Sequence, residues 1–448
     1  MIRKLSILFA GALMGATAMT AFVSPSAGVA NAAGSDTYRQ LAIFGDVFER
    51  VRAQYVDEPD DQKLIETAIN GMLTSLDPHS SYMNADQTAD MRTETRGQFG
   101  GLGIEVTMEN ELVKVIAPFE GTPADEAGVL ANDLIAEING EEVRGLTLSE
   151  AVDKMKGDIG TSVDLTIIRE GASQPVRLSI ERAEIKVPSV RHSVEGDIGY
   201  IKLLRFNEQT TVGLEAAIAD IEKQVGEDKL RGYVLDMRRN PGGLLDEAVS
   251  VTDAFLESGE IVSTRGRNAE ETRRYNARAG DEVNGKPLVV LVNGGSASAS
   301  EIVAGALQDQ RRATVVGSRS FGKGSVQTII PLGANGALRL TTALYYTPSG
   351  SSIQGRGIMP DIAIEQPLPP EVLEQMGVTA EELAERRGES SLRGHITGAE
   401  ESEEGSGSLD YVPPEKEDDL QLQYALDLLR GTKTHAAFPP NQEASIAN

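Results

Sequence analysis

The sequence predicts an α/β protein whose main sheet is buried on both faces. Strands and helices alternate from residue 198 to about 366, the pattern of crossover units in a covered sheet. The run Leu288–Val292 is apolar throughout, as expected of a central strand. The chain has 448 residues, 40% of them hydrophobic and 25% charged, which indicates a folded protein of about two to four domains.

The first 32 residues have the layout of a secretory signal peptide. Arg3 and Lys4 precede an apolar run, Leu5–Val23, and Ala30-Asn31-Ala32 offers a cleavage site between small residues. We therefore expect export to the periplasm or the outer face of the cytoplasmic membrane, with a mature chain beginning at Ala33. The alternative is an uncleaved anchor, because about 19 apolar residues can just span a bilayer.

Residues 33–95 are predicted to form a helical leader. Apolar residues recur there mostly at intervals of three and four, the helical period. They are Leu41, Phe44, Phe48 and Val51, then Leu64, Ala68, Met72 and Leu73. We expect two amphipathic helices, joined at residues 57–60 and ending near 76–78. Such helices pack on their own domain or on a partner subunit more often than they bind a ligand.

Residues 96–183 are predicted to form a compact β-rich module with one helix near 148–156. Three stretches resemble a PDZ domain of the bacterial protease type. They are Gly100-Gly101-Leu102-Gly103-Ile104-Glu105-Val106, then Thr122-Pro123-Ala124 with Ala127-Gly128-Val129, and Ala131-Asn132-Asp133-Leu134-Ile135 with Asn139-Gly140. Asn132 stands where that family usually has glycine, at a turn that asparagine tolerates because it also adopts left-handed backbone angles.

A peptide-binding site is predicted at Gly101, Leu102, Gly103 and Ile104. A glycine-rich loop leaves backbone N–H groups free for a carboxylate, and the strand that begins at Ile104 offers an edge to an extended peptide. We expect partners with free C-termini. Alternatively, the loop is only a tight turn. Arg169 either pairs with a carboxylate to couple the module to the body or is a solvated surface side chain.

Residues 184–366 are predicted to form the αβ body. The expected strands are 198–204, 232–237, 260–264, 287–292, 313–316, 326–330 and 337–345, and the expected helices are 210–225, 244–256 and 299–309. Residues 367–448 are predicted to form an acidic, partly disordered tail. Residues 361–420 hold 17 acidic and 4 basic residues, 400–408 are typical of a disordered linker, and 420–429 of a short helix without chemistry.

The net charge and the absence of cysteine exclude several classes of function. The net charge of -26 repels phosphate backbones and anionic lipid, so nucleic acid is a poor partner. The chain has no cysteine, which excludes thiol catalysis, thiolate zinc sites and iron–sulfur clusters. Any nucleophile must be oxygen or nitrogen.

A candidate nucleophile follows the central strand. The small-residue run 293–301 leads into a predicted helix, which places serine hydroxyls at a helix N-terminus, where free N–H groups and the helix dipole favour negative charge. An oxyanion can be stabilised there. Taken alone, the run is more typical of a serine-rich helix cap.

A serine needs a base, and the candidates are few. Of the four histidines, His192 alone lies near the body, whereas His79, His395 and His435 are expected to be at the surface or structural. Lys323 lies between two glycines beside Phe321, and burial among apolar groups lowers the pKa of an amine toward the working range. Alone, such a segment is more often a phosphate or surface turn, although the spacing of a P-loop is lacking.

Two further groups complete the candidate site. Gln327 could hold the Lys323 amine by a side-chain hydrogen bond. Asn240-Pro241-Gly242-Gly243, at another strand-to-helix junction, bares backbone N–H groups that could supply an oxyanion donor beside the N–H of Ala299.

These segments together resemble the C-terminal processing peptidases, or tail-specific proteases, which are serine proteases with a Ser-Lys dyad and a PDZ domain. Gly295-Ser296-Ala297-Ser298-Ala299-Ser300-Glu301, Phe321-Gly322-Lys323-Gly324-Ser325-Val326-Gln327 and Arg238-Arg239-Asn240-Pro241-Gly242-Gly243-Leu244 carry the resemblance. It implies that Ser298 is the nucleophile, Lys323 the general base and Gln327 the residue that orients it, with Gly243 and Ala299 as oxyanion donors.

The resemblance also implies the fold and the partners. The core is expected to be crotonase-like (ClpP/crotonase), with the PDZ domain inserted before it. Cleavage is expected to pass through an acyl-enzyme and to need no metal or organic cofactor. The helical leader is expected to support a homodimer, and an adaptor lipoprotein is a further expected partner. Two alternatives are a scaffold that holds tails without cleaving them and an enzyme acting on acyl thioesters, although the export signal argues against thioesters.

Overall fold

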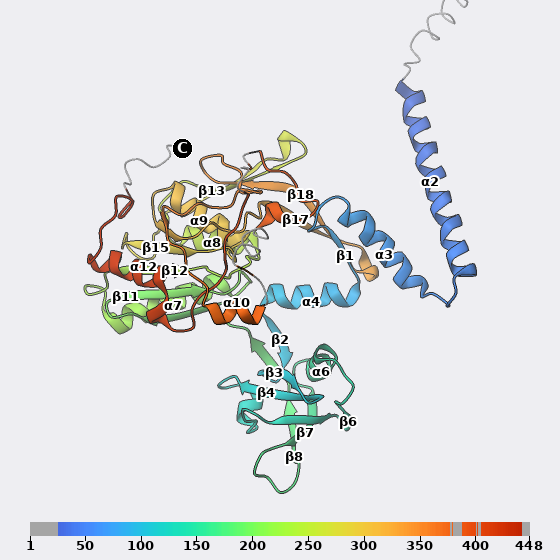
Figure 1. The fold of residues 1–448 in the computed structure, drawn as a ribbon, viewed down its shortest axis with the longest axis horizontal. Helices are drawn as coiled ribbons and strands as arrows, with labels where there is room; N and C mark the ends of the chain where they lie inside the picture. Colours follow the sequence, from blue (N-terminus) through green and yellow to red (C-terminus); the bar gives the residue numbers. More distant parts are fainter. Residues whose placement is uncertain (1–25, 377–378, 380–387, 400, 402–404, 441–448) are drawn as a thin grey trace, which may run out of the picture. The chain divides into compact units, whose positions relative to one another are not determined.

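The computed structural model describes residues 26–376, 379, 388–399, 401 and 405–440. The chain divides into two units, residues 1–71 and 72–448, which are described separately (Figure 1). Most of the predicted signal peptide, residues 1–25, lies outside the described part, so that prediction stays untested.

The first unit holds α2 (Ser26–Gln54) and most of α3 (Asp61–Thr74), in agreement with the two predicted leader helices. Several large apolar side chains of α2 are exposed: Tyr38, Leu41, Ile43, Phe44, Val47 and Val51. Among the described residues, no helix combines the length and the apolar character needed to span a membrane.

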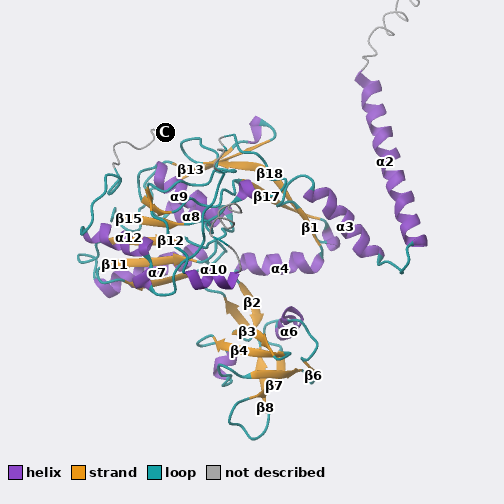
Figure 2. Ribbon diagram, in the orientation of Figure 1, coloured by secondary structure: helices purple, strands orange, loops and turns teal. Residues whose placement is uncertain are grey.

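The β-rich module of the second unit is built on one antiparallel sheet (Figure 2). Its strands run in the order β3-β4-β5-β7-β8, with β6 paired to β5. Their bounds are β3 (Ile104–Glu109), β4 (Leu112–Pro118), β5 (Leu134–Ile138), β6 (Glu141–Glu142), β7 (Ser162–Ile168) and β8 (Val176–Glu181). The helices are α5 (Pro123–Glu126) and α6 (Leu148–Met155), and a separate strand pair joins β2 (Gln98–Gly101) to β9 (Ala183–Lys186).

Local sequence explains two features of this module. α6 begins at a capping box, in which the Thr147 hydroxyl accepts from the Glu150 N–H and the Glu150 carboxylate accepts from the Thr147 N–H. Asn132 has a φ of 69°, so it occupies the left-handed turn predicted for it.

The body contains a sheet of order β10-β11-β12-β15-β16-β19, parallel except for the pair β10–β11. The bounds are β10 (Val190–Val194), β11 (Ile198–Leu203), β12 (Gly232–Asp236), β15 (Leu288–Val292), β16 (Thr314–Gly317) and β19 (Ile362–Ala363). The helices α7 (Thr210–Val225), α8 (Leu245–Asp253) and α9 (Ala299–Asp309) connect these strands.

Alternate residues of the central strands face two different cores, because side chains in a strand alternate between its faces. On β15, Val290 and Val292 pack with α7, α8 and α9, whereas Val289 and Leu291 pack with α12 (Leu420–Arg430). The predicted sheet with two covered faces is confirmed. The terminal helix, expected to be incidental, supplies the cover of one face.

A second, antiparallel sheet lies in the body, in the order β1-β18-β13-β14 with β17 on β18. Its strands are β1 (Ser81–Met83), β13 (Glu260–Gly266), β14 (Arg273–Asn276), β17 (Ser325–Pro331) and β18 (Ala337–Tyr346). α4 (Ala85–Arg96) follows β1; Asn84 caps its start, and Gly97, at a φ of 67°, ends it.

Described parts of the acidic tail are ordered, although its composition predicts partial disorder; residues 400 and 402–404 of the predicted linker lie outside the described residues. After α10 (Pro370–Met376), short turns lie at Glu389–Ser391 and Lys416–Asp418, and others at Ala269–Glu271 and Gly333–Asn335 in the body. Within the predicted linker, residues 405–408 pack against the body: Ser406 is buried, and the Gly407 N–H donates to the Ser320 carbonyl at 2.9 Å. Backbone hydrogen bonds to the body, which composition does not encode, explain the difference.

Candidate active site

Ser298 lies on a sharp turn between β15 and α9. Its φ of 54° and ψ of -110° are unusual for a residue with a side chain, and such strain persists only where neighbours fix the backbone. The turn is held in place by two side chains: Asn293 Oδ1 accepts from the Arg239 N–H at 3.1 Å, and the Ser296 hydroxyl donates to the Met237 carbonyl at 2.8 Å.

Lys323 lies on the loop between β16 and β17, and its side chain is partly buried. Burial lowers the pKa of the Lys323 amine below its usual value of 10.5. Negative charges nearby, first among them Glu389, act in the opposite direction. A lysine with a lowered pKa is the kind that can accept a proton from a hydroxyl.

Glu301, on the first turn of α9, connects the two candidate residues. Its Oε2 accepts from the backbone N–H of Ser298 at 2.8 Å and from that of Lys323 at 2.9 Å. Its Oε1 accepts from the Ser320 hydroxyl at 2.5 Å and from the Gly322 N–H at 2.7 Å. The side chain is fully buried, and burial raises the pKa of Glu301 to about 7 although these hydrogen bonds oppose the rise.

The shared carboxylate places the backbone nitrogens of Ser298 and Lys323 within about 6 Å of each other. Within the described residues, no hydrogen bond joins the Ser298 hydroxyl to the Lys323 amine. A cavity of about 680 Å³ borders Lys323 and Ala297. Its other lining residues are His79, Arg239, Pro241, Gly294, Gly295, Phe321, Gly388, Ser408, Leu409 and Asp410.

Gln327 lies on β17 and does not make the hydrogen bond predicted for it. Its amide nitrogen donates to the Ser325 hydroxyl at 2.9 Å and lies 3.4 Å from the Thr341 hydroxyl. No hydrogen bond to the Lys323 amine is present in the described part of the chain, so the orienting role of Gln327 stays a prediction.

The two predicted oxyanion donors belong to segments in close contact. A methyl group added at Gly242 would lie 2.9 Å from the Ala299 nitrogen and 2.9 Å from Ser298 Cβ. Gly243, with a φ of 149°, lies directly against the Phe206 backbone. Among the described residues, neither the Gly243 N–H nor the Ala299 N–H has a hydrogen-bond acceptor, which leaves both available to a ligand oxygen.

Two of the histidines differ in their position relative to the cavity at Lys323. His192 lies outside the Lys323 cavity and has its Nε2 2.8 Å from a carboxylate oxygen of Asp220, so it does not serve Ser298. His79, expected to be incidental, lines the cavity beside Lys323. No group of three or more His, Cys, Asp or Glu side chains within the described part is arranged to hold a metal ion.

The predicted peptide-binding loop presents backbone N–H groups that are free of acceptors among the described residues. The carbonyls of Leu102 and Gly103 accept from Ala124 and Phe119, whereas their own N–H groups have no acceptor in the described part of the chain. Gly103 has a φ of 76°, and a methyl group there would lie 2.3 Å from Thr122 Cβ. Gly101 ends β2, and Ile104 begins β3, which is an edge strand among the described strands.

Arg169 does not couple the module to the body. Its guanidinium donates to both carboxylate oxygens of Asp133 at 2.7 Å and to the Gly128 carbonyl at 2.8 Å, all within the β-rich module.

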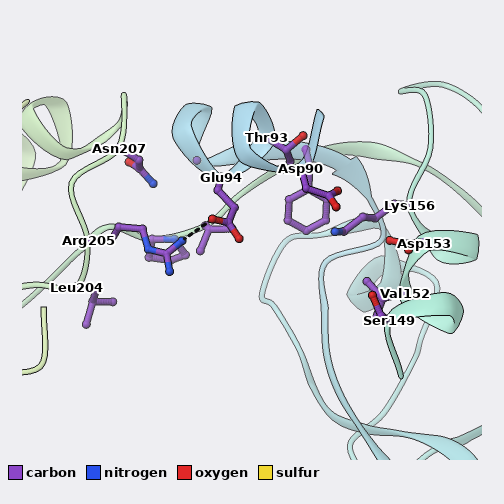
Figure 3. Close-up of a pocket in the computed structure, with 14 residues that line it drawn as sticks. Asp90, Thr93, Glu94, Ser149, Val152, Asp153, Lys156, Leu204, Arg205 and Asn207 are labelled. Atoms are coloured by element: carbon purple, nitrogen blue, oxygen red, sulfur yellow. Dashed lines mark ion pairs between the residues drawn. The ribbon is translucent and has the colours of Figure 1, made fainter. Parts of the chain in front are cut away.

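A second cavity, of about 570 Å³, is lined by α4, α6 and the loop at Leu204–Asn207 (Figure 3). Arg205 pairs with Glu94 there at 3.5 Å, and Lys156 lies over the Phe99 ring. Its lining includes the hydroxyls of Thr93 and Ser149 but no histidine and none of the catalytic residues predicted from the sequence, whereas Lys323 lines the first cavity.

Comparison with known proteins assigns the segments. Residues 197–364 match peptidase family S41, residues 100–180 the PDZ domain, and residues 9–87 the N-terminal domain of the activating protease CtpB. A carboxy-terminal-processing protease of Bartonella bacilliformis is 60% identical over 441 residues, which cover 98% of this chain and 99% of that protein. The chain belongs to the C-terminal processing peptidase family.

Two other known proteins are also similar to this chain. A probable CtpA-like serine protease of Staphylococcus aureus is 37% identical over 324 residues, covering 72% of this chain and 64% of that protein. The solved photosystem II D1 C-terminal processing protease is 31% identical, with a TM-score of 0.41, and covers 74% of this chain and 95% of that one. This C-terminal processing peptidase is therefore a serine-type peptidase, an α/β protease with a PDZ domain.

Sequence reasoning missed three residues at this peptidase's candidate site. Glu301 was part of the serine motif but received no role, although a buried acid three residues after the serine matches the spacing of a capping box. His79 and Glu389 lie 310 residues apart in the sequence and meet beside Lys323, with nothing local to indicate it.

Proposed function

We propose that this peptidase is an exported endopeptidase that captures C-terminal tails of proteins in its PDZ domain and cleaves them with a dyad of Ser298 and Lys323. The observation that carries the proposal is the shared anchor: one buried carboxylate oxygen of Glu301 accepts from the backbone of both residues. The lowered pKa of Lys323 supports its role as the base.

Capture is assigned to the loop Gly101–Ile104. The free N–H groups of Leu102 and Gly103 suit a terminal carboxylate, and the edge of β3 suits an added peptide strand. This assignment agrees with the name of the Bartonella bacilliformis relative, a carboxy-terminal-processing protease.

Cleavage proceeds through an acyl-enzyme. The Ser298 oxygen bonds to the scissile carbonyl carbon while its proton passes to the neutral Lys323 amine, and the oxyanion accepts from the Gly243 and Ala299 N–H groups. The C–N bond then breaks, and the leaving amine takes the proton from Lys323. A water molecule then attacks the acyl carbon while its proton passes to Lys323. The bond between the Ser298 oxygen and the acyl carbon breaks, and the Ser298 oxygen takes the proton back from Lys323. The first transfer requires the Ser298 hydroxyl and the Lys323 amine to come within hydrogen-bond distance, a contact that is absent from the hydrogen bonds of the described residues.

Four further assignments extend the proposal. The signal-like segment 1–32 supports export to the periplasm or the outer face of the cytoplasmic membrane, and the glycine-rich turns at the ends of β12 and β15 support a crotonase-like core. The exposed apolar side chains of α2 support a homodimer through the leader helices. Partnership with an adaptor lipoprotein rests on family resemblance alone.

The test compares the purified mature chain with its Ser298→Ala and Lys323→Ala forms on a peptide with an apolar C-terminus. Both variants should lose cleavage while their thermal unfolding and their binding of the peptide stay unchanged. Binding without turnover by the unsubstituted protein, together with no labelling of Ser298 by a serine-directed acylating probe, would instead establish the non-catalytic scaffold.

The substrate class needs a separate measurement. Incubation with periplasmic extract, followed by mass spectrometry of protein termini, should reveal new C-termini only when Ser298 is present. Hydrolysis of acyl thioesters with no new protein termini would favour the thioester alternative.

A further inference from the structure

Residues 388–399 and 405–410, here called the tail segment, lie against both loops that carry the dyad. The Gly294 N–H donates to the Leu409 carbonyl at 3.3 Å, and the Gly407 N–H donates to the Ser320 carbonyl at 2.9 Å. A methyl group added at Gly294 would lie 1.8 Å from the Ser408 carbonyl oxygen, so the packing is tight. The tail segment therefore forms part of the cavity wall.

One carboxylate of the tail segment is fully buried beside the base. The Glu389 oxygens lie 2.8 and 3.0 Å from His79 Nε2, and one accepts from Gln354 Nε2 at 2.9 Å. The backbone N–H of Glu389 donates to the Phe321 carbonyl at 2.9 Å. Gln354 extends this connection, because its Oε1 accepts from the Gly324 N–H at 2.9 Å. The loop is thus held on both sides of the base.

Glu389 also acts on the base through its charge. It is the largest of the electrostatic influences that favour the protonated amine of Lys323, ahead of Glu301 and Asp77, while Arg339 opposes them. The other charged or titratable groups that line the cavity are His79, Arg239 and Asp410.

We propose that Glu389 is a positioning residue for the dyad: it holds the Lys323 loop through Phe321 and Gln354 and balances the charge of the amine. The inference rests on the proposed function. It makes the tail segment a required part of the active site.

Two substitutions of Glu389 distinguish its role in positioning the Lys323 loop from the effect of its charge. Glu389→Gln keeps the shape and can still accept from Gln354, but it removes the charge. Glu389→Ala removes both. Glu401→Gln is the matched control, because Glu401 pairs with His395 at 2.9 Å just as Glu389 pairs with His79, but among the described residues its side chain has no hydrogen bond to the Lys323 loop or to Gln354.

The charge is tested without relying on turnover. In a Ser298→Ala background, the pH at which acetic anhydride labels half of Lys323 is measured by mass spectrometry of peptides. Glu389→Gln should lower this midpoint by about half a pH unit or more, since it removes a charge that favours the ammonium form. Glu401→Gln should leave it unchanged. A midpoint that Glu389→Gln does not move overturns the proposal.

The geometry is tested by turnover with Ser298 intact. Glu389→Ala should lower kcat about tenfold or more with little change in KM, because the base is misplaced while substrate capture is not affected. Glu389→Gln should restore most of the loss, and full kcat in Glu389→Ala overturns the proposal. If Glu389→Ala does not fold, the proposal is judged by the pH midpoint of Lys323 labelling in Glu389→Gln. Full cleavage activity in either Ser298→Ala or Lys323→Ala would instead refute the dyad itself.

Discussion

The backbone N–H groups of Ser298 and Lys323 donate to one and the same oxygen, Oε2 of Glu301, at 2.8 and 2.9 Å. The two residues come from different loops, after β15 and after β16, and neither loop alone fixes their separation. A single buried carboxylate therefore sets the distance over which the proposed proton transfer takes place.

Replacing this carboxylate by an amide should disable the enzyme. Glu301→Gln provides one acceptor oxygen and one NH₂ group where four donors now converge, so at least one donor is left opposite another donor. We expect kcat/KM for peptide cleavage to fall about 100-fold, with the PDZ affinity for the same peptide unchanged. Near-normal kcat/KM would show that the anchor is not needed for catalysis. Glu215→Gln on α7, far along the chain from both loops, serves as the control.

The free energy of unfolding should depend on pH because of the raised pKa of Glu301. Burial raises the folded-state pKa of Glu301 from 4.5 to about 7, so the folded state binds the proton more tightly than the unfolded state does. The free energy of unfolding contributed by this group therefore decreases as pH rises from about 4.5 to about 7. Urea titrations across this range should show the decrease in the parent chain and its loss in Glu301→Gln. Parallel curves for the two proteins would contradict the assignment.

Activity should rise with pH over the neutral range. Below about pH 7 Glu301 takes up a proton and loses acceptor capacity, and Lys323, despite its lowered pKa, is more fully protonated. Both changes act in the same direction, so kcat/KM measured from pH 5.5 to 8.5 should fall on the acid side. A profile that is flat down to pH 5.5 would exclude a lysine base.

The glycine at 242 should be required for catalysis. An added methyl group would lie 2.6 Å from the Ala297 carbonyl oxygen and 2.9 Å from the Ala299 nitrogen. We expect Gly242→Ala to reduce acylation of Ser298 by a serine-directed probe about 100-fold, because a donor of the oxyanion site is displaced. Gly226→Ala is the matched control: its φ of 88° is close to the 95° of Gly242, but nothing lies within 4 Å of the added carbon.

The buried guanidinium of Arg238 should contribute strongly to the free energy of unfolding. Arg238 donates to Asp236 and to Asp419 at 2.7 Å, and it thereby ties β12 to the start of α12. Arg238→Met leaves two buried carboxylates without a counter-charge and should lower the free energy of unfolding by about 3–5 kcal/mol. Arg231→Met, at an exposed pair with Asp197, should cost about 1 kcal/mol or less. Equal effects in chemical denaturation would contradict this ranking.

The helices and strands of the body were predictable where the buried apolar residues recur at regular intervals in the sequence. The predicted helices 210–225 and 299–309 agree to the residue with α7 and α9, because each has a continuous buried stripe. α4 lies in the predicted helical leader, 33–95, but was not predicted as a separate helix, since Thr88 is its only buried residue and it has no apolar period. Its local signals are the capping pair Asn84 and Gln87 and the terminal Gly97.

The site was predictable only as far as short motifs extend. Ser298, Lys323 and Gly243 each lie at a glycine-rich or small-residue turn, whose chemistry is visible in sequence, and the structure places the three turns together. Glu389 gave no such signal. It lies in the most acidic part of the chain, where composition indicates solvated charge, and its burial depends on His79 and Gln354 from distant segments.

The tail segment has a consequence for how the enzyme first becomes active. A ribosome completes the catalytic loops well before it reaches the wall residues at 388 and 408–410, and α12, which covers the core sheet, comes later still. A nascent chain thus carries its nucleophile and base without the finished pocket around them. The walls of the catalytic pocket are therefore complete only after most of the chain has been translated.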